Sequence, residues 1–367
     1  RATRRARFEP LEDRRLLATI MWDGEGGDNN WSTSANWFDQ TNQLNNIMPT
    51  ANDDVVIGSD YSNETINYSG PSITLNTLHS DARLRLLGDN LGIRGDSSVG
   101  GLDLAKSATL RGQGTLTVAG GFNWTGGTIS FVQSGEIFKV DVEGPLHIGG
   151  SDSKLLNNHT ELVNRSDEST WTGSGSLTVG LAALTNEGTM SVTTAAPLIK
   201  TRDHSPYIYN RSGATWIYDV NATQPVSVNL ANDGTVLVKQ GRLHVIVAGD
   251  QTGQIAEVTS GGVFDVATGA TLDFDGGTGG FQKQRWTSDA RVTGGGTLIF
   301  SGANTDVEGQ IDLTGVVRVD GGDLRFFADN TLAQLQMAAG NLRGDSIVTV
   351  AGTLDWTGGT ITHAGGG

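Results

Sequence analysis

Residues 110–129 read LRGQGTLTVAGGFNWTGGTI, and residues 342–361 read LRGDSIVTVAGTLDWTGGTI, with 13 of 20 positions identical. A third, partial copy, WTGSGSLTV, begins at Trp171. Each copy contains a short strand pattern in which apolar residues alternate with Thr or Ser after a glycine. The recurrence of one phrase along a chain is typical of a stacked repeat architecture.

The shortest form of this phrase is a glycine, a small polar residue and then an apolar-x-apolar pattern. It recurs at residues 114–118, 175–179, 188–192, 234–238, 269–274 and 296–300. Many matching strands return after about 19–27 residues, which favours an all-β, right-handed parallel β-helix (β-solenoid) over a sandwich. About 300 residues at about 20–25 per coil give about 12–15 coils. A propeller needs about 40–50 residues per blade and a blade motif, which is missing.

Two segments depart from this pattern. Asn232-Asp233-Gly234 is the clearest hairpin turn signal in the chain. Residues 331–340 (TLAQLQMAAG) are the best helix candidate after the start of the chain. The same residues also read as a strand with Leu332, Leu335 and Met337 inward, so both alternatives stay open.

The composition excludes several classes of protein. The chain has 367 residues with 52 Gly, 7 Pro, no Cys and a formal charge of −15. No Gly-X-Y period exists, which excludes collagen, and the absence of Cys excludes disulfides and thiolate sites. The acidic body argues against a nucleic-acid partner, since phosphate binding needs a basic surface. No run of 18 apolar residues exists, so we expect no membrane insertion.

Residues 1–20 form a short basic segment with six Arg and three acidic residues. Within it, residues 8–18 read FEPLEDRRLLA. This stretch resembles the LEPR-XLL motif at the N-terminus of very large secreted or surface proteins of planctomycete bacteria, although EPLEDRRLL departs from the shorter core of that motif. The resemblance implies a sorting or processing segment and an extracellular or cell-surface location. The alternative is an ordinary basic tail.

Residues 21–60 form a second unit that contains Trp22, Trp31 and Trp37 and ends in PTANDDVVI at 49–57. This unit resembles the head that precedes β-helical passengers in autotransporter-like surface proteins. The resemblance implies a Trp-rich N-terminal cap over the apolar end of a solenoid, which must be covered. The alternative is that the three Trp form a platform on which sugars stack. Residues 61–367 would then be the β-helix repeat region, which we expect to be truncated at its C-terminus.

Enzymes that degrade polysaccharides also use the right-handed β-helix, so we searched for their chemistry. The chain has no Gly-His-Gly, and its best carboxylate pair is Asp273 and Asp275, which lie on one face of a strand. Asp265, Lys283 and Arg285 are nearby in the sequence, and a lyase needs carboxylates for Ca²⁺ and a basic residue. The alternative is a solvated outer face with Phe274 in the core. Calcium is the one cofactor that the sequence leaves open.

Trp124 and Trp356 occupy the same position of the repeated phrase, where they could stack on sugars or pack at the edge of a coil. The Asn-x-Ser/Thr sequences, such as those at Asn164 and Asn210, are interpreted as chance in a Thr- and Ser-rich chain. The sequence thus predicts a secreted or cell-surface, adhesin-like structural protein without catalytic activity. The alternative is a protein that binds or degrades polysaccharide. Expected partners are extracellular polysaccharide, other surface components, or further copies through end-to-end association.

Overall fold

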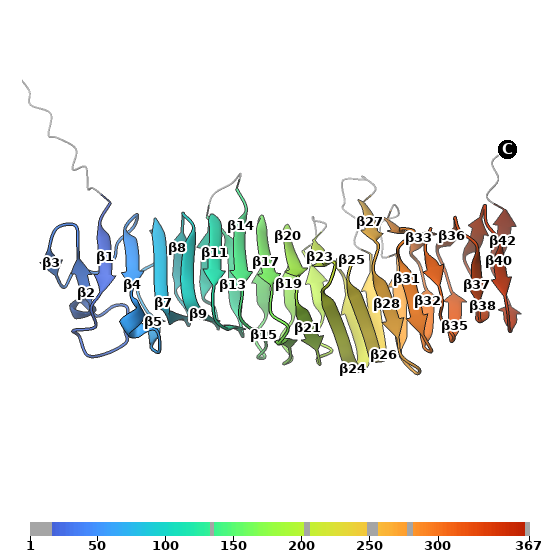
Figure 1. Ribbon diagram of the computed structural model, residues 1–367, viewed down its shortest axis with the longest axis horizontal. Coiled ribbons are helices and arrows are strands. Elements are labelled where there is room, and N and C mark those ends of the chain that lie inside the picture. Colours follow the sequence, from blue (N-terminus) through green and yellow to red (C-terminus); the bar gives the residue numbers. More distant parts are fainter. Residues whose placement is uncertain (1–16, 133–135, 202–205, 248–255, 277–281, 364–367) are drawn as a thin grey trace, which may run out of the picture.

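The chain folds into a long rod of stacked strands (Figure 1). The computed structural model describes residues 17–132, 136–201, 206–247, 256–276 and 282–363. They form an all-β parallel β-solenoid of about 14 turns, which confirms the predicted fold. Over this described part the helical structure consists of two short 3-10 helices, and no helix is long and apolar enough to cross a membrane. Most of the basic segment 1–20, including residues 8–16 of the LEPR-XLL-like stretch, lies outside the described residues.

The strands divide into a head, early coils, central coils and late coils. The head contains β1 (Thr19–Trp22), η1 (Ser34–Asn36), β2 (Trp37–Asp39), β3 (Leu44–Asn45) and η2 (Ser59–Tyr61). The early coils contain β4 (Asp54–Ile57), β5 (Thr65–Tyr68), β6 (Ile73–Leu75), β7 (Thr77–Leu86), β8 (Asn90–Ile93) and β9 (Ser97–Leu104). The central coils contain β10 (Thr109–Gly112), β11 (Gly114–Val118), β12 (Phe122–Trp124), β13 (Gly127–Phe131), β14 (Phe138–Val142), β15 (Leu146–Ile148), β16 (Lys154–Leu156), β17 (Thr160–Asn164), β18 (Ser169–Trp171), β19 (Leu177–Val179), β20 (Ala182–Asn186), β21 (Thr189–Val192), β22 (Leu198–Lys200), β23 (Tyr207–Asn210), β24 (Thr215–Val226), β25 (Asn229–Asn232) and β26 (Thr235–Ile246). The late coils contain β27 (Ala256–Ser260), β28 (Val263–Val266), β29 (Thr271–Asp275), β30 (Gln282–Trp286), β31 (Arg291–Gly294), β32 (Thr297–Phe300), β33 (Asn304–Val307), β34 (Gln310–Ile311), β35 (Val316–Val319), β36 (Asp323–Phe326), β37 (Asn330–Leu332), β38 (Gln334–Met337), β39 (Asn341–Gly344), β40 (Val348–Val350), β41 (Leu354–Trp356) and β42 (Thr360–His363).

From β11 to β22, each coil contributes three strands that pair in parallel with strands of the next coil. For example, β11, β12 and β13 pair with β14, β15 and β16. Leu116 aligns with Val140, and Val140 aligns with Leu162, so these two steps are 24 and 22 residues. Both steps lie within the spacing expected from the sequence.

The duplicated phrase corresponds to one coil. Leu110 aligns with Ile129 in the pair β10 and β13, and Leu342 aligns with Ile361 in the pair β39 and β42. The second glycine of Trp-Thr-Gly-Gly has positive φ in both copies, 86° at Gly127 and 82° at Gly359. A side chain there would be strained and would meet the backbone of the coil before it, which explains the repeated glycine.

The core fills the inside of the coils. In strands such as β11 and β14 the apolar residues alternate with half-exposed polar ones, so one side of each strand faces inward. The region 331–340 follows the same rule as strands β37 and β38, with Leu332, Leu335 and Met337 buried, so the strand alternative is correct and the helix is wrong. The turn at 232–234 closes no hairpin, because β25 and β26 each pair in parallel with strands of other coils.

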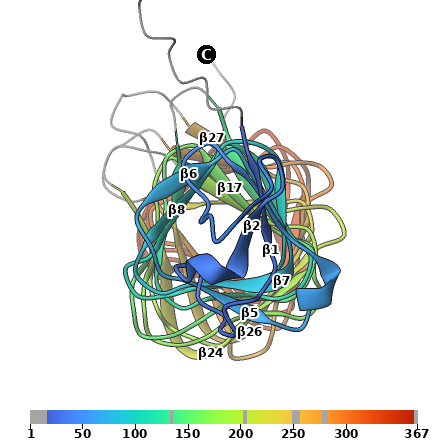
Figure 2. The same ribbon diagram turned by 90° about the vertical axis from the view of Figure 1, so that its left-hand side faces the viewer.

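The head is joined to the solenoid by continuous strand pairing. β1 pairs antiparallel with β2, and β2 pairs antiparallel with β3. On its other side, β1 pairs in parallel with β4, and β4 pairs in parallel with β7. Figure 2 looks onto this end, where β1 and β2 lie across the ring formed by the coils.

Candidate functional site

The three Trp of the head lie in a buried cluster. Trp22 and Trp31 each pack edge-on against Trp37, with ring centroids 4.8 and 4.7 Å apart, and Trp31 also meets Tyr68 of the coil strand β5. The Nε1–H of Trp37 donates to the carbonyl oxygen of Trp31 at 2.7 Å. Because these rings are buried, their faces are not presented to a sugar, and they pack the head onto the first coil.

The two Trp of the repeated phrase lie in different surroundings. Trp124 is fully buried and aligns with Leu104 of the preceding coil and Ile148 of the following one. Trp356 aligns with Met337 on one side only, and 53% of its surface is exposed. Of the five Trp that the sequence marks as candidate ligand contacts, Trp356 alone has an exposed ring in this structure.

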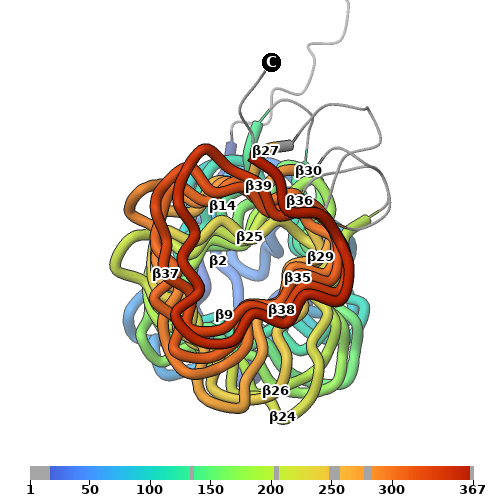
Figure 3. Tube along the Cα trace, turned by 90° about the vertical axis from the view of Figure 1, so that its right-hand side faces the viewer, coloured from blue at the N-terminus to red at the C-terminus, as the bar shows by residue number. Residues whose placement is uncertain are grey.

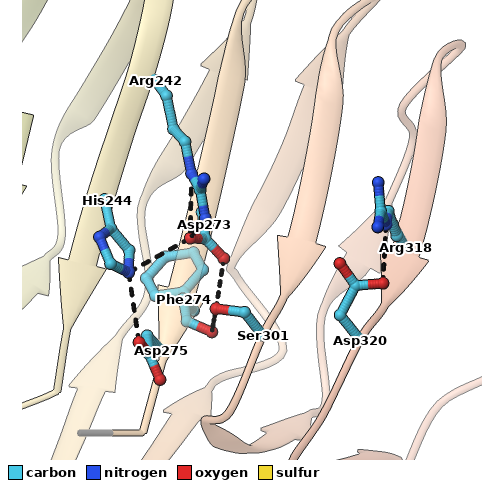
Figure 4. A network of polar contacts seen from close by, with 8 residues as sticks. All are labelled: Arg242, His244, Asp273, Phe274, Asp275, Ser301, Arg318 and Asp320. Carbon is cyan, nitrogen blue, oxygen red and sulfur yellow. Dashed lines mark hydrogen bonds and ion pairs between the residues drawn. The ribbon is translucent and has the colours of Figure 1, made fainter. Parts of the chain in front are cut away.

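Asp273 and Asp275 belong to a polar network on the outside of β26, β29 and the segment after β32 (Figure 4). Asp273 is fully buried, because the guanidinium of Arg242, which pairs with it, lies over its Oδ2. The hydroxyl of Ser301 donates to Oδ1 of Asp273 at 2.8 Å. The Nε2 of His244 lies 3.3 Å from an oxygen of each of the two carboxylates.

This network leaves no free carboxylate for catalysis or for calcium at Asp273. Both of its oxygens are already in contact with protein groups, and a cation would have to displace the guanidinium of Arg242. In the part of the chain that the structure describes, no three His, Asp or Glu residues gather in a way that could hold a metal. The solvated outer face expected as the alternative is wrong for Asp273, whereas Phe274 lies in the core as expected.

The other residues considered for a lyase site lie apart from this network. Lys283 and Arg285 belong to β30, where they pair with Asp306 at 2.7 Å and with Glu308 at 2.7 Å. Asp265 belongs to β28, which aligns with β26 and β31 rather than with β29. The proximity of these residues in the sequence therefore does not assemble one site.

No known family, curated protein or solved structure matches this chain. Its function must therefore be argued from its own residues.

Charged residues on the outer faces pair between successive coils. Asp141 of β14 meets Lys139 at 3.0 Å and Arg165 at 2.6 Å, and Arg165 also pairs with Glu187 of the next coil. Burial would raise the pKa of Asp141, but hydrogen bonds from Arg165 and Lys139 outweigh burial and hold that pKa below its ordinary value.

A similar pairing occurs near the head, where Asp103 of β9 meets Arg83 at 2.8 Å and Arg85 at 3.1 Å and accepts from Asn123 at 2.8 Å. Each exposed ion pair contributes up to about 1 kcal/mol to the stability of the fold. These ion pairs therefore mainly neutralise the surface charge and align neighbouring coils.

A ladder of buried asparagines, which the sequence analysis missed, runs through the central coils. Its four members are the last residues of β17, β20, β23 and β25: Asn164, Asn186, Asn210 and Asn232. Each of the first three donates from Nδ2 to Oδ1 of the next, at 2.8, 2.9 and 2.8 Å. The signal in the sequence is an Asn that returns every 22–24 residues and is followed, after one residue, by Ser or Gly.

Lys154 is a second buried polar residue that the sequence did not indicate. It takes an inward position in β16, between Gly127 and Leu177 of the adjacent coils. Its Nζ donates to the carbonyl oxygens of Gly149 at 2.6 Å and Asp152 at 2.8 Å. Burial lowers the pKa of Lys154 below the ordinary 10.5, which the charge of Asp152 partly offsets.

A Lys154→Met variant tests this burial through the pH dependence of stability. Since the pKa is lower in the folded chain than in the unfolded one, the cost of burying the charge is present below the folded pKa and disappears above 10.5. We expect the free energy of unfolding of the wild type minus that of the variant to rise as the pH increases from the folded pKa to 10.5, by about 1.4 kcal/mol per unit of pKa shift. Urea unfolding at a series of pH values measures it. A flat difference would contradict the assignment, and Lys239→Met, at an exposed lysine paired with Asp219, controls for the loss of a surface charge.

Proposed function

We propose that this chain is a secreted or cell-surface β-solenoid rod with a structural, adhesin-like role and no catalytic activity. The observation that carries the proposal is the pairing of outer charges between coils, at Asp103, Asp141 and Asp273, instead of their convergence on one groove. A surface whose charges satisfy one another suits a solvated spacer that holds other parts of a surface protein apart. An enzyme needs free acid and base groups within reach of a substrate.

The sequence resemblances support the location in this proposal. The FEPLEDRRLLA stretch at residues 8–18 resembles the LEPR-XLL motif of planctomycete surface proteins, and residues 21–60 resemble an autotransporter-like head. Together they favour an extracellular or cell-surface protein whose partners are extracellular polysaccharide or other surface components. A parallel β-solenoid is the architecture that the resemblance of residues 21–60 implies.

One observation favours the alternative of a polysaccharide-binding protein. The indole of Trp356 is exposed beside the half-exposed or exposed apolar residues of β40 and β42, and an exposed indole can stack on the face of a sugar ring. Degradation of the polysaccharide would need in addition a free pair of acidic and basic groups, and Asp273 does not offer one.

A panel of algal and plant polysaccharides tests the proposal. The chain is incubated with each polymer, and both co-sedimentation and new reducing ends are scored, with Trp356→Ala as the matched variant. We expect no reducing ends above the background of the polymer alone. Reducing ends that disappear in Asp273→Asn would overturn the proposal in favour of an enzyme. Co-sedimentation that is lost in Trp356→Ala would establish the polysaccharide-binding alternative.

A further inference from the structure

A polar cavity of about 460 Å³ lies on the outside of the early coils. Figure 3 looks along the rod and shows the coils one behind another, so that the corners of successive coils form rows. The cavity lies on one such row, at the segments before β4, between β6 and β7, and between β8 and β9. Its polar lining consists of Thr50, Asn52, Asp53, Asn76 and Arg94, which we call the corner site.

Backbone hydrogen bonds between successive coils hold the corner site together. The N–H of Asn76 donates to the carbonyl oxygen of Asp53 at 3.0 Å, and the N–H of Arg94 donates to that of Leu75 at 3.1 Å. Neighbouring layers of a β-sheet are about 4.8 Å apart, so two steps place Asp53 and Arg94 about 10 Å apart along the rod. The site is therefore elongated in the direction of the rod.

Two side chains of the corner site are fixed by the protein and still have an acceptor to offer. Oδ2 of Asp53 accepts from the N–H and from the hydroxyl of Thr50, both at 2.8 Å. Nδ2 of Asn76 donates to Oδ1 of Asp54 at 2.7 Å. Among the residues that the structure describes, none donates to Oδ1 of Asp53 or to Oδ1 of Asn76. Because both side chains are held before a ligand arrives, binding costs less conformational entropy.

Arg94 supplies the cation of the corner site. Its side chain is exposed and forms no ion pair with any described residue, whereas Arg83 and Arg85 both pair with Asp103. The site thus contains a guanidinium near one end and the carboxylate of Asp53 nearer the other. This arrangement suits a ligand with one carboxylate and several hydroxyls, because guanidinium binds carboxylate and a carboxylate accepts from hydroxyls. A metal cation would be repelled by Arg94, and a sulfate by Asp53.

We propose that the corner site binds an acidic polysaccharide built from hexuronate sugars. The guanidinium of Arg94 binds the carboxylate of one sugar, and hydroxyls of the neighbouring sugar donate to Oδ1 of Asp53 and Oδ1 of Asn76, with the amide of Asn52 beside them. The inference rests on the proposed function, in which extracellular polysaccharide is an expected partner. A free amino acid also carries a carboxylate, but it is shorter than the row of about 10 Å, which two linked sugar rings can follow.

Calorimetric titration of the full chain with trigalacturonate and trimannuronate tests the proposal. The methyl ester of each trimer is the matched probe, since it has the same sugar rings without the charge. We expect at least one trimer to bind about tenfold more tightly than its ester. Arg94→Gln is expected to remove this difference by weakening the binding of the acid alone. The control Arg291→Gln removes an exposed cation that pairs with Asp312, and it is expected to preserve the difference.

An Asn52→Gly variant tests the contacts to the sugar hydroxyls. Asn52 has a φ of 72°, which glycine adopts without strain, so the variant removes the amide and keeps the backbone. Because an amide contacts the acid and the ester alike, we expect both ligands to bind about fivefold more weakly. This pattern differs from that of Arg94→Gln, which affects the acid alone.

Absence of binding, equal affinities for acid and ester, or a difference that survives Arg94→Gln would overturn the proposal. Displacement of the bound trimer by glycine would overturn it in favour of a free amino acid. Binding that Trp356→Ala abolishes would place the sugar at Trp356 and would equally refute the corner site. None of these results contradicts the structural role of the rod, which is judged separately by the absence of new reducing ends.

Discussion

A Val118→Asp variant is expected to lose about 3–5 kcal/mol of its free energy of unfolding. Val118 is fully buried, and in β11 it is enclosed by Val99 of the preceding coil and Val142 of the following one. A carboxylate at this position has no cation to pair with among these aliphatic neighbours, and an unpaired buried charge carries a penalty of this size. Urea unfolding followed by Trp fluorescence measures the loss.

The repeated phrase supplies a matched control at Val350, which has the same position in the copy at residues 342–361 but is only half-buried. We expect Val350→Asp to cost about 1 kcal/mol or less, because water reaches the new carboxylate. The comparison keeps the substitution and the local sequence Thr-Val-Ala-Gly constant. Equal losses in the two variants would show that the inward register of β11 is wrong.

An Asn186→Asp variant is expected to lower the free energy of unfolding by a similar amount, about 3–5 kcal/mol. The Nδ2 of Asn186 donates to Oδ1 of Asn210 and to the carbonyl oxygens of Gly188 and Thr215 at 2.9–3.0 Å. Aspartate has the same shape but no donor, so a buried carboxylate would face three acceptors at close range. The free energy of unfolding falls because these three acceptors lose their donor and face a buried negative charge.

The matched control is Asn221→Asp, since Asn221 is exposed in β24 and the substitution adds the same charge. We expect this variant to stay within about 0.5 kcal/mol of the wild type. Circular dichroism during thermal unfolding compares the two. A similar midpoint for both variants would mean that the ladder contributes little to stability.

The sequence predicted the fold because the repeat is local. Alternation within strands such as 114–118 and the return of the phrase at residues 342–361 report directly on inward faces and on coil length. The segment 331–340 was ambiguous because it is short: Leu332, Leu335 and Met337 fit either period. The Asn-Asp-Gly turn at 232–234 lies at a corner of a coil, which uses the same turn residues as a hairpin.

The polar interior could not be predicted in this way. Arg242 and Asp273 are 31 residues apart, so their pairing depends on the lengths of the segments between them. Lys154 occupies an inward position where the pattern expects an apolar residue, and only the carbonyl groups of Gly149 and Asp152 explain it. Asn164 and Asn210 each begin an Asn-x-Ser sequence, which is interpreted as chance from the sequence, although both side chains are fully buried in the ladder.

The asparagine ladder has a consequence for how a repetitive chain reaches one structure. Coils that share a phrase can exchange neighbours during folding, because Val, Leu and Ile accept one another at little cost. An Asn that is stacked on an aliphatic residue, however, keeps none of the bonds that join Asn164, Asn186 and Asn210. The four coils that carry Asn are therefore distinguished from the coils that lack it, and stacking one of them on a coil outside the ladder is penalised.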